Sequence, residues 1–265
     1  MTRDTNDLVA QYKPRLLHGI RRGFGDYYDR LGLTAAGSLV LASAIFLGMA
    51  IASVFHQIFQ LPVAIVASVT AFWFLATYAW AGNVLVAHRI AYFEDPSLRS
   101  YVDILKEYGV GLLKLAGVEL VVSAIMVMDA IFFLAQSSSA LKIVGTIVTY
   151  MLLLWFMTMV WHWPFFITEN RDTLKILKKS ALVAVDNPLL SLGALVACAL
   201  CGALAATGIA IPFVIGGLAS CIQVRLHREC LKKYGFAEDE PEEIDNAGWP
   251  TASGPPHRLH PRRPG

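Results

Sequence analysis

Charged residues are scarce in this sequence, and long stretches contain none at all. Only 16% of the 265 residues are charged and 56% are hydrophobic, whereas a soluble domain typically has about 25% charged and about 45–50% apolar residues. The scarcity argues against a soluble protein and favours an integral membrane protein. The length leaves room for one membrane domain and short tails, but not for a second globular domain.

Signatures of chemistry are missing too. The sequence contains no Walker A motif, no GxSxG motif and no zincin motif. Cys198 and Cys201 form a C-x-x-C pair, but they lie in an apolar segment without the context of a redox site, and the four cysteines suggest no disulfide framework. No basic stripe alternates with aromatic residues, so nucleic acid is not an expected partner. We therefore expect a protein that is not an enzyme and that binds no cofactor and no metal.

The sequence does contain six apolar segments, and crossing the hydrocarbon of a bilayer takes about 20 helical residues. We predict spans at residues 33–55, 61–87, 109–135, 143–163, 186–206 and 209–226. They would form an all-α six-helix bundle, a transmembrane domain of residues 33–234. The last two spans share one apolar run, divided by a turn at residues 207–212. A re-entrant hairpin in this run is the alternative.

Basic residues alternate between the two ends of these segments. The stretch before the first span carries six of them, and the connection around residues 56–61 has none. The connection after the second span again has Arg89, Arg99 and Lys106. Because cytoplasmic loops collect Lys and Arg, both termini should lie in the cytoplasm, below a bacterial cytoplasmic (inner) membrane. The positive charge also makes the anionic lipid headgroups of the inner leaflet an expected partner.

Two polar segments flank the spans. Residues 1–32 combine basic residues with apolar ones at helical spacing, for example Leu16, Ile20 and Phe24, which predicts an amphipathic helix in the cytoplasmic interface. Residues 235–265 contain a block of acids followed by a Pro- and Gly-rich end, with almost no apolar content. We expect this cytoplasmic tail to be disordered.

Two of the predicted spans leave the membrane with similar residues. The second and the fourth both end in the pattern Val-x-His, whose histidine is His88 in the second span and His162 in the fourth. A related pattern around His227 would make three parallel helical hairpins. The three histidines would then lie at one membrane depth, where imidazoles could handle protons or bind a metal. Three separate interfacial histidines are the alternative.

Glu119 is the first candidate site residue. It lies about 10 residues into the predicted third span, or about 15 Å at a rise of 1.5 Å per residue, which is near the bilayer centre. A carboxyl group at that depth is paired, protonated or turned towards water. It is therefore either a proton or cation site or a buried structural hydrogen bond, and both interpretations stay open. Asp129 lies roughly 15 Å further along, near the outer interface, so the two acids do not form a carboxylate pair.

Small and amide residues predict contacts between helices. Asn83 is a lone amide late in the second span, and most such residues bridge helices by hydrogen bonds. In the fifth span small residues recur at every fourth position, which lets another helix approach closely: Gly193, Ala197, Cys201 and Ala205. The approaching helix belongs to the same chain, which is the favoured case, or to a second copy in a homo-oligomer.

The layout resembles the YesL-like family of bacterial membrane proteins of unknown function. The residues that carry the resemblance are FGDYYDRLG at 24–32, WPFF at 163–166, and TLKILKKSAL at 173–182 followed by DNP at 186–188. Such proteins often have an Asn-aromatic pattern after the entry to the first span, where this chain has Gly37, Ser38 and Leu39. The resemblance implies an accessory role beside carbohydrate uptake systems and transfers no catalytic residues.

Three functions follow as hypotheses. The first is an accessory or scaffold protein that docks to a membrane transporter, because catalytic motifs are absent and the cytoplasmic segments are basic. The second is a small carrier or channel whose path passes Glu119. The third and weakest is a membrane enzyme with a site at the cytoplasmic face, which would need His88 and His162 to converge with Glu94 or Glu169.

Overall fold

The computed structural model describes residues 13–59, 61–92, 94, 96–168, 172–207 and 216–236. Within these ranges all regular secondary structure is helical and no strand occurs, which confirms the all-α prediction. The helices are, in chain order, α2 (Leu16–Asp29), α3 (Leu31–Ile58), α4 (Leu61–Ala91), α5 (Ser100–Leu134), α6 (Ser139–Thr168), α7 (Thr173–Asp186), α8 (Pro188–Ala206) and α10 (Gly217–Lys233).

Four helices are long and apolar enough to cross a membrane. They are α3, α4, α6 and the part of α5 from Lys106 to Leu134. Helices α7 and α8 pass the same test only as a pair, and they are bent by 106° at their junction, as in a broken span or a re-entrant loop. The described residues therefore contain four candidate spans, or five if the bent pair is one span.

The six-helix count and the three-hairpin repeat stay predictions. Residues 208–215, where the sixth span is predicted to begin, lie outside the described residues. The described remainder of that segment belongs to α10, which has 17 residues, carries charged residues from Arg225 onward and is not among the candidate spans. Residues 1–12 and 237–265, which include most of the predicted disordered tail, also lie outside the described residues.

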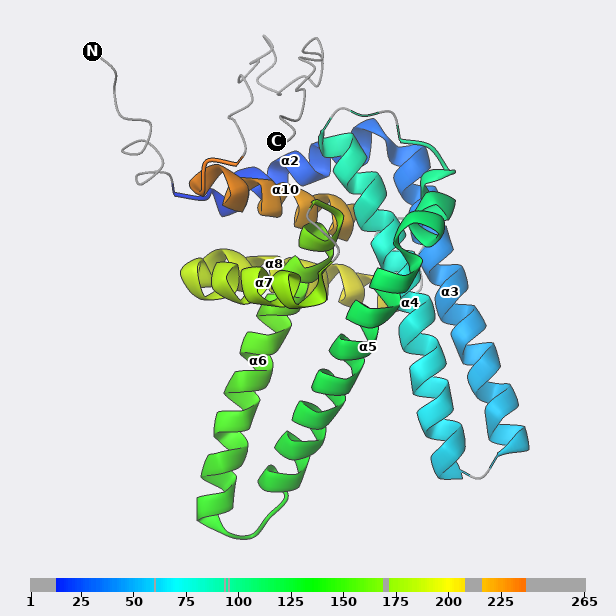
Figure 1. Cartoon of the computed structure of the whole chain (residues 1–265), viewed down its shortest axis with the longest axis vertical. Helices are drawn as coiled ribbons and strands as arrows, with labels where there is room; N and C mark the ends of the chain where they lie inside the picture. The colour runs from blue at the N-terminus through cyan, green and yellow to red at the C-terminus, as the bar shows by residue number, and fades with distance from the viewer. Residues whose placement is uncertain are drawn as a thin grey trace.

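Helices α3 and α4 form one antiparallel hairpin and α5 and α6 form another. Figure 1 shows both hairpins pointing the same way from a common base and diverging towards their turns. Glycine allows close contact within each hairpin. A Cβ on Gly48 of α3 would lie 3.0 Å from the Phe72 ring of α4, and one on Gly145 of α6 would lie 2.9 Å from the backbone nitrogen of Leu134 in α5.

Most of the surface of these spans is not covered by the chain itself. In the most apolar 18-residue window of each span, only 17–22% of the residues are buried. A largely apolar exposed surface of this kind needs lipid or other proteins around it. The buried core lies instead at the base of the hairpins, around large side chains such as Trp161, Phe166 and Leu226.

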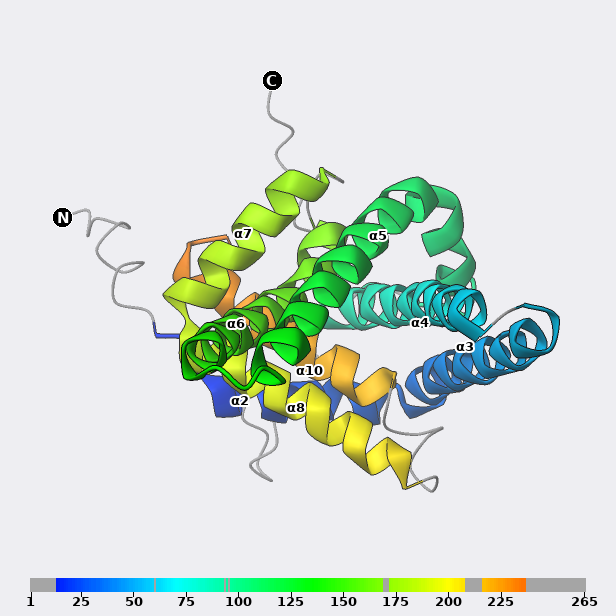
Figure 2. The same cartoon turned by 90° about the horizontal axis from the view of Figure 1, so that it is seen from below.

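A second layer of helices crosses the base. Figures 1 and 2 show α2, α7, α8 and α10 lying across the direction of the hairpins. Helix α10 is the centre of this layer, because it packs against α2, α4, α6 and α8, and most of its residues from Gly217 to Cys230 are buried. Close packing of α2 on α10 again needs glycine, since a Cβ on Gly23 would lie 2.7 Å from the Cα of Ile222.

The N-terminal amphipathic helix is present as α2, but one of its faces is covered by protein. Gly19, Gly23 and Asp26 are buried in α2, and a Cβ on Gly19 would meet the Leu226 side chain of α10. The opposite face leaves large side chains exposed, namely Leu17, Phe24 and Tyr28. This helix is therefore part of the folded base, and its predicted position in the membrane interface remains a prediction.

Candidate functional site

Glu119 of α5 and His162 of α6 form a buried pair. The Oε1 atom of Glu119 lies 2.8 Å from Nδ1 of His162, and the two side chains are 1% and 0% exposed. Sequence reasoning named both residues but did not pair them, because they are 43 positions apart. The hairpin brings them together, since the antiparallel course of α5 and α6 places residues before and after the turn at the same height.

A second polar contact lies beside this pair. Ser123 follows Glu119 by one helical turn, and Trp155 precedes His162 by two turns, so both contacts lie on the same faces of α5 and α6. Nε1 of Trp155 donates a hydrogen bond of 2.9 Å to Oγ of Ser123. The Trp155 ring also meets the His162 imidazole edge to face, with centroids 5.4 Å apart. Two hydrogen-bonded pairs, Glu119–His162 and Ser123–Trp155, therefore join α5 to α6, and such polar contacts commonly hold membrane helices together.

The Glu119–His162 pair can hold a proton between its two groups. Either a neutral Glu119 donates to Nδ1, or an Nδ1–H group donates to the carboxylate. The other ring nitrogen, Nε2, is buried and has no hydrogen-bond partner among the described residues. The pair therefore has the chemistry of a proton site, whereas its burial closes it to water in this conformation.

A proline in α6 leaves a free backbone carbonyl group that a side chain of α10 satisfies. Pro164 lies inside the helix and has no N–H group, so the carbonyl of Val160, four residues earlier, loses its normal helical partner. Nε2 of Gln223 in α10 donates a hydrogen bond to this carbonyl instead. Nearby, Nε1 of Trp161 donates to Oγ of Ser191 in α8 at 2.8 Å. The exit of α6 is thus joined to two helices of the base.

A buried ion pair joins α2 to α10. The guanidinium group of Arg225 donates two hydrogen bonds to the Asp26 carboxylate, at 2.5 and 2.6 Å, and the two residues are 6% and 8% exposed. A two-point contact of this kind fixes the relative rotation of the helices as well as their distance. At the N-terminal end of α10, the backbone nitrogen of Gly217 donates to Oγ of Ser38 in α3.

The side-chain amide of Asn83 bridges three helices, as lone amides in membrane helices commonly do. Its Nδ2 donates to the carbonyl oxygens of Ala79 in its own helix and Gly37 in α3, at 2.9 and 3.1 Å. The hydroxyl of Tyr101 in α5 donates to its Oδ1 at 3.2 Å. Gly37 must lack a side chain here, because a Cβ would lie 2.1 Å from Oδ1 of Asn83. All three polar positions of the amide are used, which gives Asn83 a structural role.

The three histidines of the predicted cluster make different contacts. His88 stacks on Tyr92, with ring centroids 4.3 Å apart. His227 meets the edge of Phe165, at 4.5 Å between centroids, and its Nε2 is buried without a partner among the described residues. His162 binds Glu119 instead. In the part of the chain that the structure describes, no group of three His, Cys, Asp or Glu residues could hold a metal ion.

The remaining acids do not complete a site at the described positions. Asp129 is exposed on α5, apart from the buried Glu119. The enzyme hypothesis needs Glu94 or Glu169 beside the histidines. Glu94 lies 3.9 Å from Arg89, and Glu169 lies outside the described residues. Among the candidate residues that the structure describes, Glu119 and His162 are brought together, and no hydrogen bond or ion pair joins another of them to this pair.

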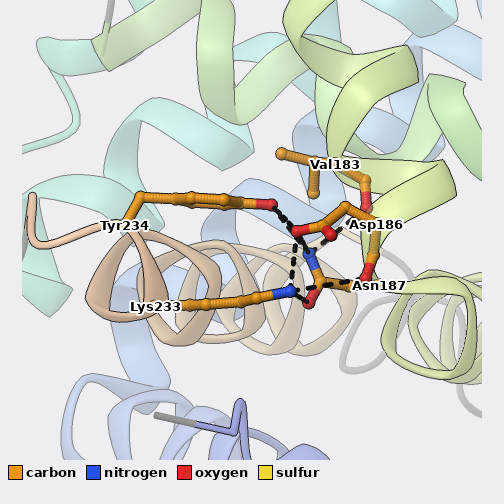
Figure 3. Close-up of polar contacts among 5 residues, drawn as sticks. All are labelled: Val183, Asp186, Asn187, Lys233 and Tyr234. Carbon is orange, nitrogen blue, oxygen red and sulfur yellow. Dashed lines mark hydrogen bonds and ion pairs between the residues drawn. The ribbon is translucent and has the colours of Figure 1, made fainter. Parts of the chain in front are cut away.

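The junction of α7 and α8 is tied to the end of α10 outside the four spans. Figure 3 shows the Lys233 and Tyr234 side chains converging on Asp186 and Asn187. Nζ of Lys233 lies 2.6 Å from Oδ2 of Asp186 and 3.0 Å from Oδ1 of Asn187. The Tyr234 hydroxyl donates to Asp186 and accepts from Nδ2 of Asn187. Hydrogen bonds from Lys233 and Tyr234 lower the pKa of Asp186, which favours the ionised form of this carboxyl group.

Sequence reasoning did not identify the partners in α2 and α10. Gln223, Arg225 and Asp26 carry the main contacts of the base, but Gln223 lies in the predicted sixth span and Arg225 near its end. Pro164 was the available signal, because an internal proline predicts a free carbonyl that some donor must satisfy. No sequence pattern says which helix supplies that donor.

The four long apolar helices and the polar contacts between them fit the class of all-helical, multi-pass membrane proteins. No family model, no curated protein and no solved structure matches the chain.

Proposed function

We propose that the protein is an accessory or scaffold component of a complex in a bacterial cytoplasmic membrane, with both termini in the cytoplasm. The observation that carries the proposal is the contrast between its two layers. The base is densely packed and cross-linked by the Asp26–Arg225 pair and the Asp186–Lys233 contact, whereas at most 22% of the residues in the apolar window of a span are buried. A cross-linked base that carries mostly uncovered spans suits the binding of other membrane helices.

The partner class in this proposal is a membrane transporter. The resemblance to the YesL-like family points to carbohydrate uptake systems as the most specific partner. A second copy of the chain is less favoured, because the small-residue stripe of α8 is partly used within the chain. A Cβ on Gly193 would lie 2.7 Å from the Leu16 side chain of α2, and Cys201 is buried.

Co-purification tests this proposal. The full chain, tagged at its C-terminus and solubilised in mild detergent, should retain a transporter subunit at a stoichiometric ratio. Exposed span residues such as Val66 and Val121, 67% and 56% exposed, offer matched variants. Val66→Trp or Val121→Trp should reduce the amount of the partner without changing thermal unfolding of the isolated chain. A monomer that purifies alone from several detergents contradicts the proposal.

The second candidate function is a proton or cation carrier. It is favoured by the Glu119–His162 pair and by Nε2 of His162, which has no hydrogen-bond partner among the described residues. The burial of both side chains counts against an open path, so we place this function second. Flux into liposomes, followed with a pH-sensitive dye, decides between the two. Flux that exceeds that of protein-free liposomes and is lost in Glu119→Gln would establish the carrier, and flux equal to the background would exclude it.

A further inference from the structure

Exposed apolar side chains lie on both sides of the bend between α7 and α8. Helix α7 turns Ile176, Val183 and Ala184 towards the rest of the chain. Its opposite face is exposed, and the exposed apolar side chains continue across the bend onto α8. We call them the α7–α8 surface: Leu182, Val185, Leu189, Leu192, Val196 and Leu200. On α8 their spacing of three or four residues makes one stripe. On α7, Lys178 lies in line with Leu182 and Val185, one and two turns before them.

Both helices lie across the hairpins rather than along them. Figure 1 shows α7 and α8 at the level where α5 and α6 leave the base, and Figure 2 shows the two helices running in different directions from the region of α6. The 106° bend at their junction lets the two helices point in different directions within one plane. If the hairpins cross the bilayer, a helix perpendicular to them at their base lies in the plane of the cytoplasmic interface.

The charges of α7 match that position. Lys175, Lys178 and Lys179 are exposed within little more than one turn. Asp186 at the end of α7 binds Lys233. Asp172 lies 3.6 Å from Lys175, an exposed ion pair that water and headgroups can compete with. A stripe of large apolar residues beside lysines is the pattern of helices that lie in an anionic membrane surface, because lysine stems can follow the apolar surface while the ammonium groups reach the headgroups.

We propose that α7 and α8 lie flat in the cytoplasmic leaflet and that Lys175, Lys178 and Lys179 bind the headgroups of anionic phospholipids. The α7–α8 surface then contacts the acyl chains, and the lysines contact phosphodiester groups. This site needs no protein partner, so it stands or fails independently of the accessory function.

Lipid-dependent thermal unfolding tests the headgroup site. Purified full-length protein in neutral detergent is titrated with phosphatidylglycerol or with phosphatidylcholine, and the midpoint of unfolding is recorded. Phosphatidylglycerol should raise the midpoint at concentrations where phosphatidylcholine does not. In the variant Lys175→Gln/Lys178→Gln/Lys179→Gln the concentration needed should rise at least roughly 5-fold, because one basic residue near an anionic surface contributes roughly 5-fold and Lys175 is already paired with Asp172.

The matched control removes the same charge elsewhere. The variant Lys13→Gln/Lys106→Gln/Lys142→Gln changes three exposed lysines outside α7 and should need a much smaller increase in phosphatidylglycerol concentration than the α7 variant does. An equal response of the natural sequence to both lipids, or an unchanged response of the α7 variant, overturns the headgroup site. If the α7 variant already has a lower unfolding midpoint in phosphatidylcholine, the natural sequence is titrated with phosphatidylglycerol at high ionic strength. Loss of the rise in midpoint at high ionic strength supports the headgroup site, and an unchanged rise overturns it.

Depth measurements test the flat position of α8. Nitroxide labels are attached to cysteines introduced at Leu189 and Leu200, with Cys198, the least buried native cysteine, changed to Ala. Accessibility to oxygen and to a polar relaxation agent in liposomes should give both positions the same depth. A spanning α8 would separate them by about 16 Å along the membrane normal, and that result would overturn the proposal. Ile143 and Leu154 of α6, equally spaced and exposed, supply the control pair with different depths.

Discussion

The contact between Gln223 and the proline-freed carbonyl of Val160 gives the sharpest test of how the base is held together. In the natural sequence Pro164 has no N–H group, and Gln223 supplies the missing donor from α10. The substitution Gln223→Leu keeps the size of the side chain but removes that donor. With alanine at position 164, the backbone N–H returns and can satisfy the carbonyl from within α6. The effect of Gln223→Leu should therefore depend on residue 164.

The expected magnitude follows from the cost of an unsatisfied buried carbonyl. Gln223 is 2% exposed, so water does not replace the lost donor, and leaving the carbonyl unpaired should cost about 1–3 kcal/mol in the free energy of unfolding. In the Pro164→Ala background the same substitution should cost less than about 1 kcal/mol. The difference between the two costs is the coupling energy of a double-mutant cycle.

The assay is denaturant-induced unfolding in mild detergent, followed by the fluorescence of the tryptophans that lie near this contact, Trp161 and Trp163. Gln57→Leu is a matched control, because Gln57 is exposed at the end of α3 and its replacement should change stability by less than about 0.5 kcal/mol. An equal cost of Gln223→Leu with proline and with alanine at position 164 would refute the reasoning. The amide would then act by packing alone.

Further variants test two other buried contacts and one exposed position by the same unfolding assay. Asp26→Asn leaves the Arg225 charge buried without its counter-charge and should cost about 3–5 kcal/mol, while the double variant Asp26→Leu/Arg225→Met should cost much less; equal losses would contradict this. Glu119→Gln keeps a side chain that can hydrogen-bond to His162, so it should cost less than His162→Phe, which leaves Glu119 buried alone at about 1–3 kcal/mol. Asp129→Asn, at an exposed position, should change stability by less than about 0.5 kcal/mol, and a large loss would show an unrecognised contact.

The spans were the most predictable part of the fold. The first, second and fourth predicted spans fall within helices of the structure, and the third ends one residue beyond α5. A long apolar run in hydrocarbon must satisfy its backbone hydrogen bonds internally, as a helix does. The helix ends were less predictable: α5 begins at Ser100, well before the predicted start at residue 109, since a helix continues beyond the bilayer wherever its residues permit.

The candidate site was predictable only as separate residues. Glu119 was identified because an acid in an apolar run needs a partner, and His162 because it lies at a membrane exit. Their pairing depends on the register of α5 against α6, which Gly145 and the hairpin turn set. The roles of Gln223 and Arg225 depend on α10 entering the base, although α10 carries more charge than a typical buried helix.

The sequence by itself determined the class of this protein, because the hydrophobic effect and backbone hydrogen bonding act on local composition. Those forces make 30-residue helices such as α6 and favour their insertion in a membrane. Only the tertiary structure decided which polar groups meet: Glu119 with His162, Asp26 with Arg225, and Gln223 with the carbonyl that Pro164 leaves free. Such contacts act over a few ångströms between distant parts of the chain, so they exist only once the helices are packed.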